Sequence, residues 1–558
     1  MRTALPIVTL AALLTGLNAL KPLHIDDATY YFNARQIAAH PLDPYGYTIL
    51  YWSDPLPALH VLAPPLLPYW WAGAIRLFGE RPVLWKLWLF PFALLFVASL
   101  ASLLRRFAAA VAMPLLVLLT LSPVFLPSLN LMLDIPALAL SLASLALFFR
   151  ACDGDRLRGA ILAGLIAGLA MQTKYTAFVA PAVVLAYALL HGKMRLGLST
   201  AVSAVFVFAA WETALICRYG ESHLLHQLKL GDYANQSKLN LLGSLFPLLG
   251  GAVPTLALLA LTVLRSPRWL LVSAALFVLL SYLLLLWPAG FGFGEMASNL
   301  SVALFACTGG GVLLGAAAVA WRLGRPAWRM ESGEGSQKTP LPSRTDWFLI
   351  LWLALEIAAY VAISPFSAVR RIMGVTIAAT LLLGRLADRT PLEPWRENLI
   401  RGLAVVTSLL GLGIFSVDCL EARAEQQAAY AAANRIRQEH PQAVIWYAGY
   451  WGFQYYAERS GMKQIIPLLN TEDETPPLLP PSRFHLGDWL VITDEAIPQQ
   501  KLDLNRPELE AMGQISVDDG IPLSTLMDYY AGAVPLHHRK DPRIVLRLFR
   551  VKDDWLAR

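Results

Sequence analysis

Charged residues and cysteines are both scarce in this sequence. Only 15% of its 558 residues are charged, whereas soluble globular proteins carry roughly 25%. This scarcity excludes an ordinary cytosolic enzyme and a disordered protein. The four cysteines are scattered and form no CxxC pair. The sequence therefore indicates neither a disulfide framework nor a cysteine metal cluster.

Nucleotide-binding motifs are also missing. The chain has no Walker loop, HExxH or GxSxG motif, or GxGxxG after a strand, in a context that would support one. ATP hydrolysis and dinucleotide chemistry are therefore not indicated. The net charge of +6 is small for this length and does not favour nucleic acid as a partner.

Apolar stretches are abundant instead. Hydrophobic residues make up 56% of the chain, and the mean hydropathy is +0.51. Stretches of the length that a spanning helix needs recur along the chain, which predicts a polytopic α-helical membrane protein with about thirteen spans. We expect the first, Ala4 to Leu20, to be a retained helix and not a cleaved signal peptide. The later spans are expected to begin near Leu84, Phe107, Leu131, Gly159, Tyr175, Leu196, Leu239, Trp269, Leu300, Trp347, Ile372 and Gly402.

The positions of lysine and arginine predict the orientation of these spans. If the N-terminus is cytoplasmic, every inside loop is basic, whereas the short outside loops are mostly poor in lysine and arginine. This is the pattern that the positive-inside rule requires. We therefore expect a multi-pass protein of a bacterial inner or plasma membrane, with its C-terminus outside. The inside loops carry Arg105 and Arg106, then Arg150, Arg156 and Arg158, Lys193 and Arg195, Arg265 and Arg268, Arg322 to Arg344, and Arg385 to Arg401.

Two long polar segments are expected outside the membrane. Residues 1–418 are predicted to form the transmembrane domain, with a long first outside loop over residues 21–83. Residues 419–558 are predicted to form a small extracytoplasmic α/β domain. Its expected helices are Glu421 to Glu439 and Trp451 to Arg459, and its β-type runs are Ala443 to Ala448, Trp489 to Thr493 and Ile544 to Val551. Met330 to Arg344 is predicted to be a flexible cytoplasmic loop.

An acidic pair begins the first outside loop. Asp26 and Asp27 lie just beyond the outer end of the first helix, before Tyr30. Neighbouring carboxylates raise one another's pKa and can act as a general base or a metal ligand. The alternative is that one of them caps the helix that follows, and one could cap while the other acts in catalysis.

Three further boundary positions carry unexpected charge or a titratable ring. Asp134, in Leu-Met-Leu-Asp-Ile-Pro, is either a site carboxylate or a helix cap before a proline. Lys174 is either a site cation between apolar helices or a solvated loop lysine. His60, near Pro64-Pro65 and Tyr69-Trp70-Trp71, is more simply explained by a local hydrogen bond than by metal binding.

Two adjacent arginines break the charge trend. Arg370 and Arg371 lie at an outer helix end, where the orientation predicts few cations. One explanation is recognition of an anionic headgroup. The other is that both side chains snorkel to lipid phosphates.

The order of these features resembles the membrane glycosyltransferases of the C superfamily (GT-C). The similarity is carried by the acidic pair, by Arg76-Leu77-Phe78-Gly79-Glu80, by the Leu-Met-Leu-Asp-Ile-Pro stretch at 131–136 and by Thr-Lys-Tyr-Thr at 173–176. It covers roughly residues 1 to 400 and is greatest to family 39. That family holds protein O-mannosyltransferases and the aminoarabinose transferases that modify lipid A.

The resemblance implies a specific chemistry. A hexose or pentose would move from a polyprenyl-phosphate carrier to a lipid, glycan or protein acceptor at the extracytoplasmic face. Asp26 or Asp27 would be the general base, and Asp134 would match the second acidic position. The candidate substrate-binding residues are Lys174, Arg370, Arg371, His60 and Tyr30.

One feature departs from the aminoarabinose transferases. They carry an acidic-basic pair just before the Pro-Pro step, where this chain has Leu62-Ala63. This departure puts lipid A aminoarabinose transfer in doubt. No cofactor is certain: a divalent metal could bridge the donor phosphate, but the sequence shows no convincing ligand set.

Two other classes compete with a transferase. A transporter or lipid flippase would tend to show internal repeats and charges near mid-membrane, whereas this chain has no repeat and its notable charges lie at the outer boundary. A scaffold that only displays the outer domain would not need boundary carboxylates and cations on separate loops. Both comparisons favour the enzyme.

Overall fold

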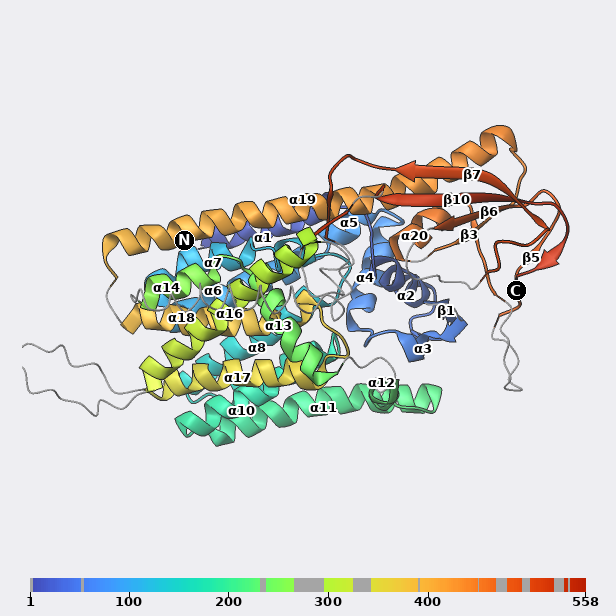
Figure 1. Cartoon of the computed structure of the whole chain (residues 1–558). Coiled ribbons are helices and arrows are strands. Elements are labelled where there is room, and N and C mark those ends of the chain that lie inside the picture. The colour runs from blue at the N-terminus through green and yellow to red at the C-terminus, as the bar shows by residue number, and fades with distance from the viewer. Residues whose placement is uncertain are drawn as a thin grey trace, which may run out of the picture.

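The structure of the chain is a computed structural model. It describes residues 4–51, 55–230, 237–264, 296–324, 343–389, 392–449, 451–467, 479–493, 502–525, 536–539 and 542–557. Long helices lie side by side in a bundle, and a five-stranded sheet lies beyond one end of it (Figure 1). This confirms the predicted fold class, a helical membrane protein with a small C-terminal α/β region.

The described helices begin near the predicted span positions, but fewer of them than the predicted thirteen or so are long enough to cross a membrane. Six helical segments are long and apolar enough to cross a membrane: Pro82–Phe107, Asp134–Asp153, Met194–Tyr219, Val302–Gly324, Arg344–Ile363 and Pro394–Glu439. The pair Lys238–Ala252 and Leu256–Leu264, bent by 86°, would be a seventh. Shorter apolar helices cover Ala4–Leu20, Ala109–Thr120, Leu157–Met171 and Tyr175–His191, and α18 covers Met373–Arg389. The span expected near Trp269 and the loop expected over residues 330–344 lie largely or wholly outside the described residues.

Four of these helices and two short 3-10 turns position the site. They are α8 (Asp134–Asp153), η3 (Tyr175–Phe178), α10 (Val179–His191), α17 (Arg344–Ile363), η4 (Val369–Arg371) and α18 (Met373–Arg389). α17 begins with a capping box in which Ser343 and Asp346 bond each other's backbone N–H groups, which satisfies donors that a helix start leaves open. α17 and α18 are joined through η4, so the two arginines lie at the turn between two helices.

The predicted first outside loop folds against the end of the bundle. It contains α2 (Asp27–Ala39), the paired strands β1 (Thr48–Leu50) and β2 (Pro55–Pro57), α3 (Ala58–Val61) and α4 (Leu66–Phe78). Aromatic packing anchors it, because the Tyr31 ring stacks on Trp85 with centroids 5.1 Å apart. Trp70 and Trp88 stack in the same way, at 5.2 Å.

One helix connects the bundle to the tail domain. α19 (Pro394–Glu439) runs along the bundle and continues to the sheet (Figure 1), so the predicted boundary at residue 418 falls inside a continuous helix. The sheet order is β4-β3-β6-β10-β7, and β3 and β6 are parallel neighbours. The strands are β3 (Ile445–Ala448), β4 (Lys463–Gln464), β6 (Trp489–Thr493), β7 (Leu509–Val517) and β10 (Ile544–Val551), and α20 (Trp451–Arg459) packs beside them. The helix and strand segments predicted for the tail are confirmed.

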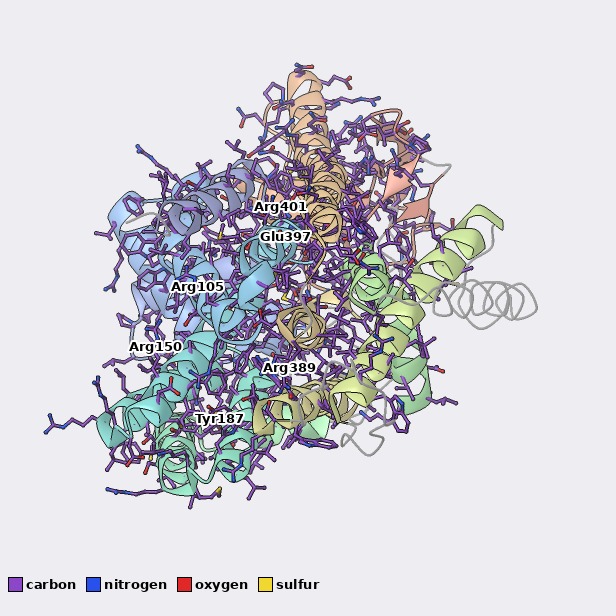
Figure 2. All side chains as sticks on the ribbon, turned by 90° about the vertical axis from the view of Figure 1, so that its left-hand side faces the viewer. Arg105, Arg150, Tyr187, Arg389, Glu397 and Arg401 are labelled. Carbon is purple, nitrogen blue, oxygen red and sulfur yellow. The ribbon has the colours of Figure 1, made fainter. Side chains whose placement is uncertain are left out.

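Basic side chains gather at the end of the bundle away from the sheet. Figure 2 looks onto that end, where Arg105, Arg150, Arg389 and Arg401 are labelled. These residues come from three inside loops of the predicted topology, because Arg389 and Arg401 belong to the same loop. These four arginines, which the positive-inside pattern assigns to one side, therefore lie at one end of the bundle.

Candidate active site

The two adjacent carboxylates of the first outside loop lie in different surroundings. Asp26 occupies the N-cap position of α2, but its side chain makes no capping hydrogen bond, and 13% of it is exposed. Asp27 is the first residue of α2, and its side chain is fully buried. The capping role considered for Asp26 is therefore not the role of its side chain.

Asp26 is held by groups from two other segments. The hydroxyl of Tyr51, just after β1, donates to Oδ1 of Asp26 at 3.1 Å. Nη1 of Arg370, in η4, donates to Oδ2 at 3.3 Å. Tyr30 also lies close to Asp26, since the carboxylate adds to burial in raising the pKa of the Tyr30 phenol. One carboxylate oxygen thus meets a neutral donor, and the other meets a cation at the long end of hydrogen-bond distance.

Asp134 and Lys174 form an ion pair beside this group. Asp134 is the first residue of α8, and Lys174 precedes η3; their side chains are mostly buried and bonded to each other. Burial lowers the pKa of Lys174 to about 8. Asp134 acts to raise this pKa, but Arg370 and Arg371 oppose its effect. The predicted Asp134 and Lys174 therefore come together with the predicted arginines.

The arginines leave this cluster with an excess of positive charge. Arg370 and Arg371 both act electrostatically on Asp134, and both guanidinium groups lie over the ring of Phe366, at 6.0 Å and 4.3 Å. Burial, followed by repulsion from Arg370, lowers the pKa of Arg371 to about 10. The Nε atoms of both arginines are buried and make no hydrogen bond within the described part of the chain.

This charge balance favours an anionic ligand. The cluster holds three cations, Lys174, Arg370 and Arg371, against two carboxylates, Asp26 and Asp134. Buried donors without partners are costly, and a guanidinium suits a phosphate because it can donate two parallel hydrogen bonds. The arginines of this cluster can therefore hold a phosphate.

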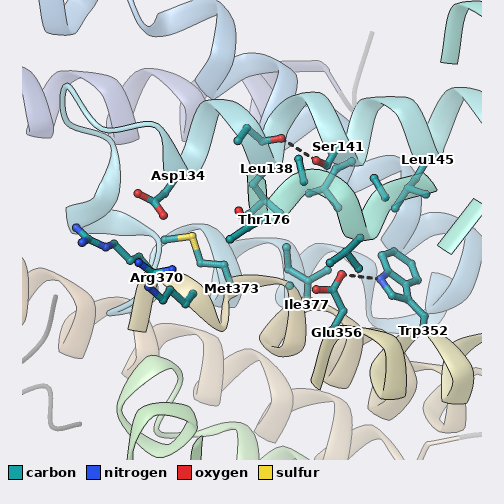
Figure 3. A pocket seen from close by; sticks show the side chains of 17 residues that line it. Asp134, Leu138, Ser141, Leu145, Thr176, Trp352, Glu356, Arg370, Met373 and Ile377 are labelled. Atoms are coloured by element: carbon teal, nitrogen blue, oxygen red, sulfur yellow. Dashed lines mark hydrogen bonds between the residues drawn. The ribbon is translucent and has the colours of Figure 1, made fainter. Parts of the chain in front are cut away.

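An apolar groove leads away from the charged cluster into the bundle. It runs between α8, α10, α17 and α18, and Asp134, Arg370 and Arg371 lie among its lining residues. Figure 3 shows Asp134 and Arg370 at one end, Met373 and Ile377 along the wall, and Glu356 with Trp352 at the other end. Trp352 Nε1 donates to Glu356 at 3.0 Å. A hydrocarbon chain could lie in this groove with an anionic head at the arginines.

Gly374 sets the width of this groove beside Glu356. A Cβ atom built on Gly374 would lie 2.1 Å from Oε2 of Glu356, closer than any real contact. A larger residue at this point would require the Glu356 carboxylate to move. An alanine here would displace Glu356 into the groove or push α17 and α18 apart.

Asp27 belongs to a separate buried network. His24 Nδ1 lies 3.5 Å and Lys86 Nζ 3.6 Å from Oδ2 of Asp27, and the backbone N–H of His24 donates to the same oxygen at 3.2 Å. Burial opposes ionisation of Asp27, but Lys86 and His24 together outweigh it and lower the pKa of the carboxyl. Burial, reinforced by Lys21, lowers the pKa of His24.

The same network connects the first helix to α19. Lys21 Nζ lies 2.7 Å from Oδ2 of Asp418, and it also donates to the carbonyl of Pro127 at 2.9 Å. Lys86 donates to the carbonyl of Lys21 at 2.7 Å. Asp27 thus takes part in joining the bundle, the outside loop and the tail helix, and the structure separates it from the cluster that contains Asp26.

His60 belongs to a third group. Its Nε2 lies 2.6 Å from Oε1 of Glu221, and its ring stacks on His226 with centroids 3.8 Å apart. The hydrogen bond from His60 is the main reason that the pKa of Glu221 is lowered. Ligand atoms of these three residues lie within 4.8 Å of one another. Two imidazoles and a carboxylate suit a divalent transition metal, so this is the candidate cation site of the described residues.

Some members of these groups are missing from the sequence-based predictions. Tyr51 could not have been predicted from the sequence, because a tyrosine in a polar loop is common. Lys86 and Lys21 could have been predicted, because a lysine beside or within an apolar span is costly and usually paired. Glu221 and His226 could not be linked to His60 because the segments are far apart in the sequence.

Comparison with known families supports a relationship over part of the chain. Residues 63–216 match the family model described as dolichyl-phosphate-mannose-protein mannosyltransferase. The match confirms the resemblance to C-superfamily membrane glycosyltransferases, and it spans Arg76–Glu80, Leu131–Pro136 and Lys174. Asp26, Asp27 and the two arginines lie outside the matched residues. Among curated proteins, none matches the chain significantly.

Solved structures with a similar arrangement come from two kinds of enzyme. ArnT from Cupriavidus metallidurans bound to undecaprenyl phosphate is 15% identical, with 88% of this chain and 93% of that chain covered and a TM-score of 0.43. The Archaeoglobus fulgidus oligosaccharyltransferase tethered to an acceptor peptide is 14% identical, with 83% and 63% covered and a TM-score of 0.48. The same archaeal enzyme with an inhibitory peptide and dolichol-phosphate has a TM-score of 0.43, at 14% identity and with 83% and 64% covered.

Proposed function

We propose that this protein is a membrane glycosyltransferase that moves a sugar from a polyprenyl-phosphate carrier to a hydroxyl of an acceptor at the extracytoplasmic face. One observation carries the proposal. Asp26, Asp134, Lys174 and the Arg370/Arg371 pair come from four separate segments and meet at the mouth of an apolar groove. Carboxylates, phosphate-binding cations and room for a hydrocarbon chain are the three features that this reaction requires.

Asp26 is the proposed general base. Its carboxylate would take the proton of the acceptor hydroxyl as the oxygen attacks the anomeric carbon of the donor. The bond between that carbon and the phosphate oxygen breaks, and polyprenyl phosphate leaves. Asp134 is less suited to this role, because its side chain is more buried than that of Asp26, at 5% against 13% exposed, and Lys174 binds it more closely than Arg370 binds Asp26. Asp27 is less suited because it is fully buried between His24 and Lys86.

The cations are proposed to hold the donor phosphate and the charge that develops on it. Arg371 has unpartnered donors in the described structure, and Arg370 and Lys174 add charge from either side. Fixed cations in a partly dehydrated site stabilise a leaving phosphate without reorganising during the reaction. The sugar itself, a hexose or a pentose, would lie between this phosphate and Asp26.

The proposed orientation places the sheet domain outside the cell. The basic end shown in Figure 2 would face the cytoplasm, and the charged cluster at the opposite end would face outward. Single cysteines introduced near Arg105 and in the exposed tail at Glu510 would distinguish the two sides. In intact cells a membrane-impermeant maleimide should label the tail and spare the first site; the reverse pattern contradicts the orientation.

The reaction is tested directly with lipid-linked donors. Membranes with the chain and without it are incubated with polyprenyl-phosphate hexoses and pentoses, and the lipids and surface glycans are measured by mass spectrometry. We expect one donor to be consumed and its sugar to appear on an acceptor only when the chain is present.

One control variant and one alternative outcome are needed to interpret the result. Asp153→Asn removes a partner of Arg106 from the other end of the bundle, where the pair spans 2.6 Å, and it should leave transfer unchanged. A flippase would move the donor between the leaflets without consuming it. Intact donor with altered sidedness would therefore contradict the transferase proposal.

A further inference from the structure

A second cavity lies between the first outside loop and the tail domain. It has a volume of about 320 Å³ and is walled by α2, β1, α20 and β4. These walls come from the two predicted outside regions, so the cavity exists only because the tail domain packs on the loop. Neither the proposed base nor the cations of the candidate active site line it.

The walls of this cavity carry hydrogen-bonding groups of both kinds. α2 contributes Arg35 and Gln36, α20 contributes Gln454 and Glu458, and β4 contributes Gln464. A guanidinium offers only donors, a carboxylate offers only acceptors, and a carboxamide offers both. Arg35 lies close enough to Glu458 to oppose the rise in the pKa of its carboxyl that burial causes. The charges of the described lining therefore balance, apart from His40 at the exposed rim.

Two polar groups of the cavity lining lack a hydrogen-bond partner. Nε2 of Gln464 is buried and makes no hydrogen bond within the described residues, and the buried hydroxyl of Tyr47 has the Asn33 amide near it but outside hydrogen-bond geometry. The remaining amide contact is weak, since Gln454 Nε2 lies 3.5 Å from Oε1 of Gln464. Buried polar groups in native proteins are almost always bonded, so these groups indicate a polar ligand or water in the cavity.

The cavity is connected to the candidate active site along two elements. Asp26 precedes α2 and Arg35 is nine residues further, a rise of about 13 Å along the helix. β1 lines the cavity up to Leu50, and the next residue, Tyr51, donates its hydroxyl to Asp26. Two elements of the cavity wall, α2 and β1, therefore lead directly to the surroundings of Asp26.

We propose that this cavity binds neutral sugar residues of a glycan acceptor. The proposal rests on the proposed function and assigns the acceptor class of the same enzyme. Vicinal hydroxyls both donate and accept, so they match alternating carboxamide, carboxylate and guanidinium groups, and the Tyr47 ring offers an apolar face beside them. The tail domain then serves as one wall of the acceptor site.

The walls fit a glycan better than the other acceptor classes. A peptide that binds by strand addition needs an exposed strand edge, but the strands of this wall are short, since β4 has two residues and β1 has three. A lipid acyl chain would need apolar walls, whereas this lining is largely polar and charged. An anionic headgroup would need an excess of cations, whereas Glu458 balances Arg35.

Binding to the purified full-length chain tests the proposal. Saturation-transfer NMR in nanodiscs would use maltose, cellobiose, a mannobiose and diacetylchitobiose as neutral probes, with a serine- and threonine-rich peptide and glucose 1-phosphate as competing classes. We expect saturable transfer to at least one neutral disaccharide. Glu458→Gln and Gln464→Leu should each weaken it about tenfold, as loss of one charged or well-buried hydrogen bond does.

Matched variants separate this inference from the proposed function. Glu510→Gln changes an exposed carboxylate on β7, away from the cavity, and should not alter binding. Asp26→Asn should abolish transfer but retain disaccharide binding. Because Glu458→Gln is isosteric, unchanged thermal stability is expected and shows that weaker binding is local.

Three results would overturn the inference. They are binding of the peptide or the phosphate in place of every neutral disaccharide, no saturable binding of any neutral probe, and disaccharide affinity that is unchanged in both cavity variants. If transfer persists in Asp26→Asn, the assignment of the base fails, while sugar binding in the cavity is still decided by its own variants.

Discussion

Asp26 and Asp27 are neighbours in the sequence but belong to two different electrostatic environments. Asp26 is partly exposed and is held by a phenol at 3.1 Å and a guanidinium at 3.3 Å. Asp27 is fully buried between an imidazole at 3.5 Å and an ammonium at 3.6 Å. The start of α2 turns one carboxylate toward the groove and the other into the junction with α19.

The difference shows how an acidic pair can combine a chemical role with a structural one. The Asp27 network pairs its charges within the protein, since Lys86 faces Asp27 and Lys21 faces Asp418. The Asp26 cluster carries one more cation than carboxylates and has buried donors without partners. An incompletely paired site is costly to the protein alone, so it fits ligand binding, while the paired site fits folding.

The largest expected effect is loss of transfer in Asp26→Asn. Removing a general base typically lowers the rate by about 10²–10⁴-fold, and the substitution keeps the shape of the side chain. Turnover of the lipid-linked donor and thermal stability should be measured on the same preparation. Near wild-type turnover in Asp26→Asn would show that Asp26 is not the base and would make Asp134 the next candidate.

Asp27→Asn should lower stability and not turnover per folded molecule. Removing one partner of a buried ion pair costs about 3–5 kcal/mol, because Lys86 would remain charged and buried. In the double variant Asp27→Asn/Lys86→Met the loss should be smaller than the sum of the single losses, by more than about 0.5 kcal/mol. Additive losses in denaturation curves would mean that the two residues do not act as a pair.

Changes among the cations should affect use of the donor. Arg370→Lys, Arg371→Lys and Lys174→Ala each remove charge-assisted hydrogen bonds to the proposed phosphate, for which about a tenfold rise in KM is expected. The measurement is a titration with lipid-linked sugar. If all three variants keep wild-type kinetics and change only expression or stability, the arginines snorkel to bulk lipid and the phosphate has no assigned partner.

Alkaline pH should weaken the Asp26 cluster. Burial lowers the pKa of Lys174 to about 8, so the side chain is charged below that pH and loses its charge above it. The value of kcat/KM for the donor should therefore fall as pH rises through about 8. In Lys174→Ala this alkaline limb should be absent, and an unchanged pH profile would assign the titration to another group.

Acidic pH should weaken the Asp27 network, as the smallest of these effects. Burial lowers the pKa of His24 in the folded protein, so the unfolded chain, with a usual value of about 6.5, takes up the proton more readily. The stability that comes from burying neutral His24 is present above about pH 6.5, and it is lost as the pH falls toward the pKa of His24 in the folded protein. His24→Gln should flatten the dependence of melting temperature on pH between about 5 and 7.

The fold class was predictable because the bilayer imposes it locally. A run of about 20 apolar residues has to be a helix where no water can bond its backbone, so composition and run length suffice. The tail segments were equally local, and the structure places α20, β6 and β10 at the predicted residues. Boundary charge also singled out Asp134, Lys174 and the two arginines, since unpaired charge there is costly.

The sequence alone thus determined the elements, the family resemblance and a set of candidate residues, because each depends on local pattern. Only the tertiary structure decided which of those candidates lie together and which lie in separate groups. Asp26 joined Arg370 across 344 positions of the chain, Asp27 joined Lys86, and His60 joined Glu221 and His226. Partners so far apart are chosen by helix packing and by the burial that packing imposes, and no local pattern records which of two adjacent carboxylates will face a groove and which will be buried.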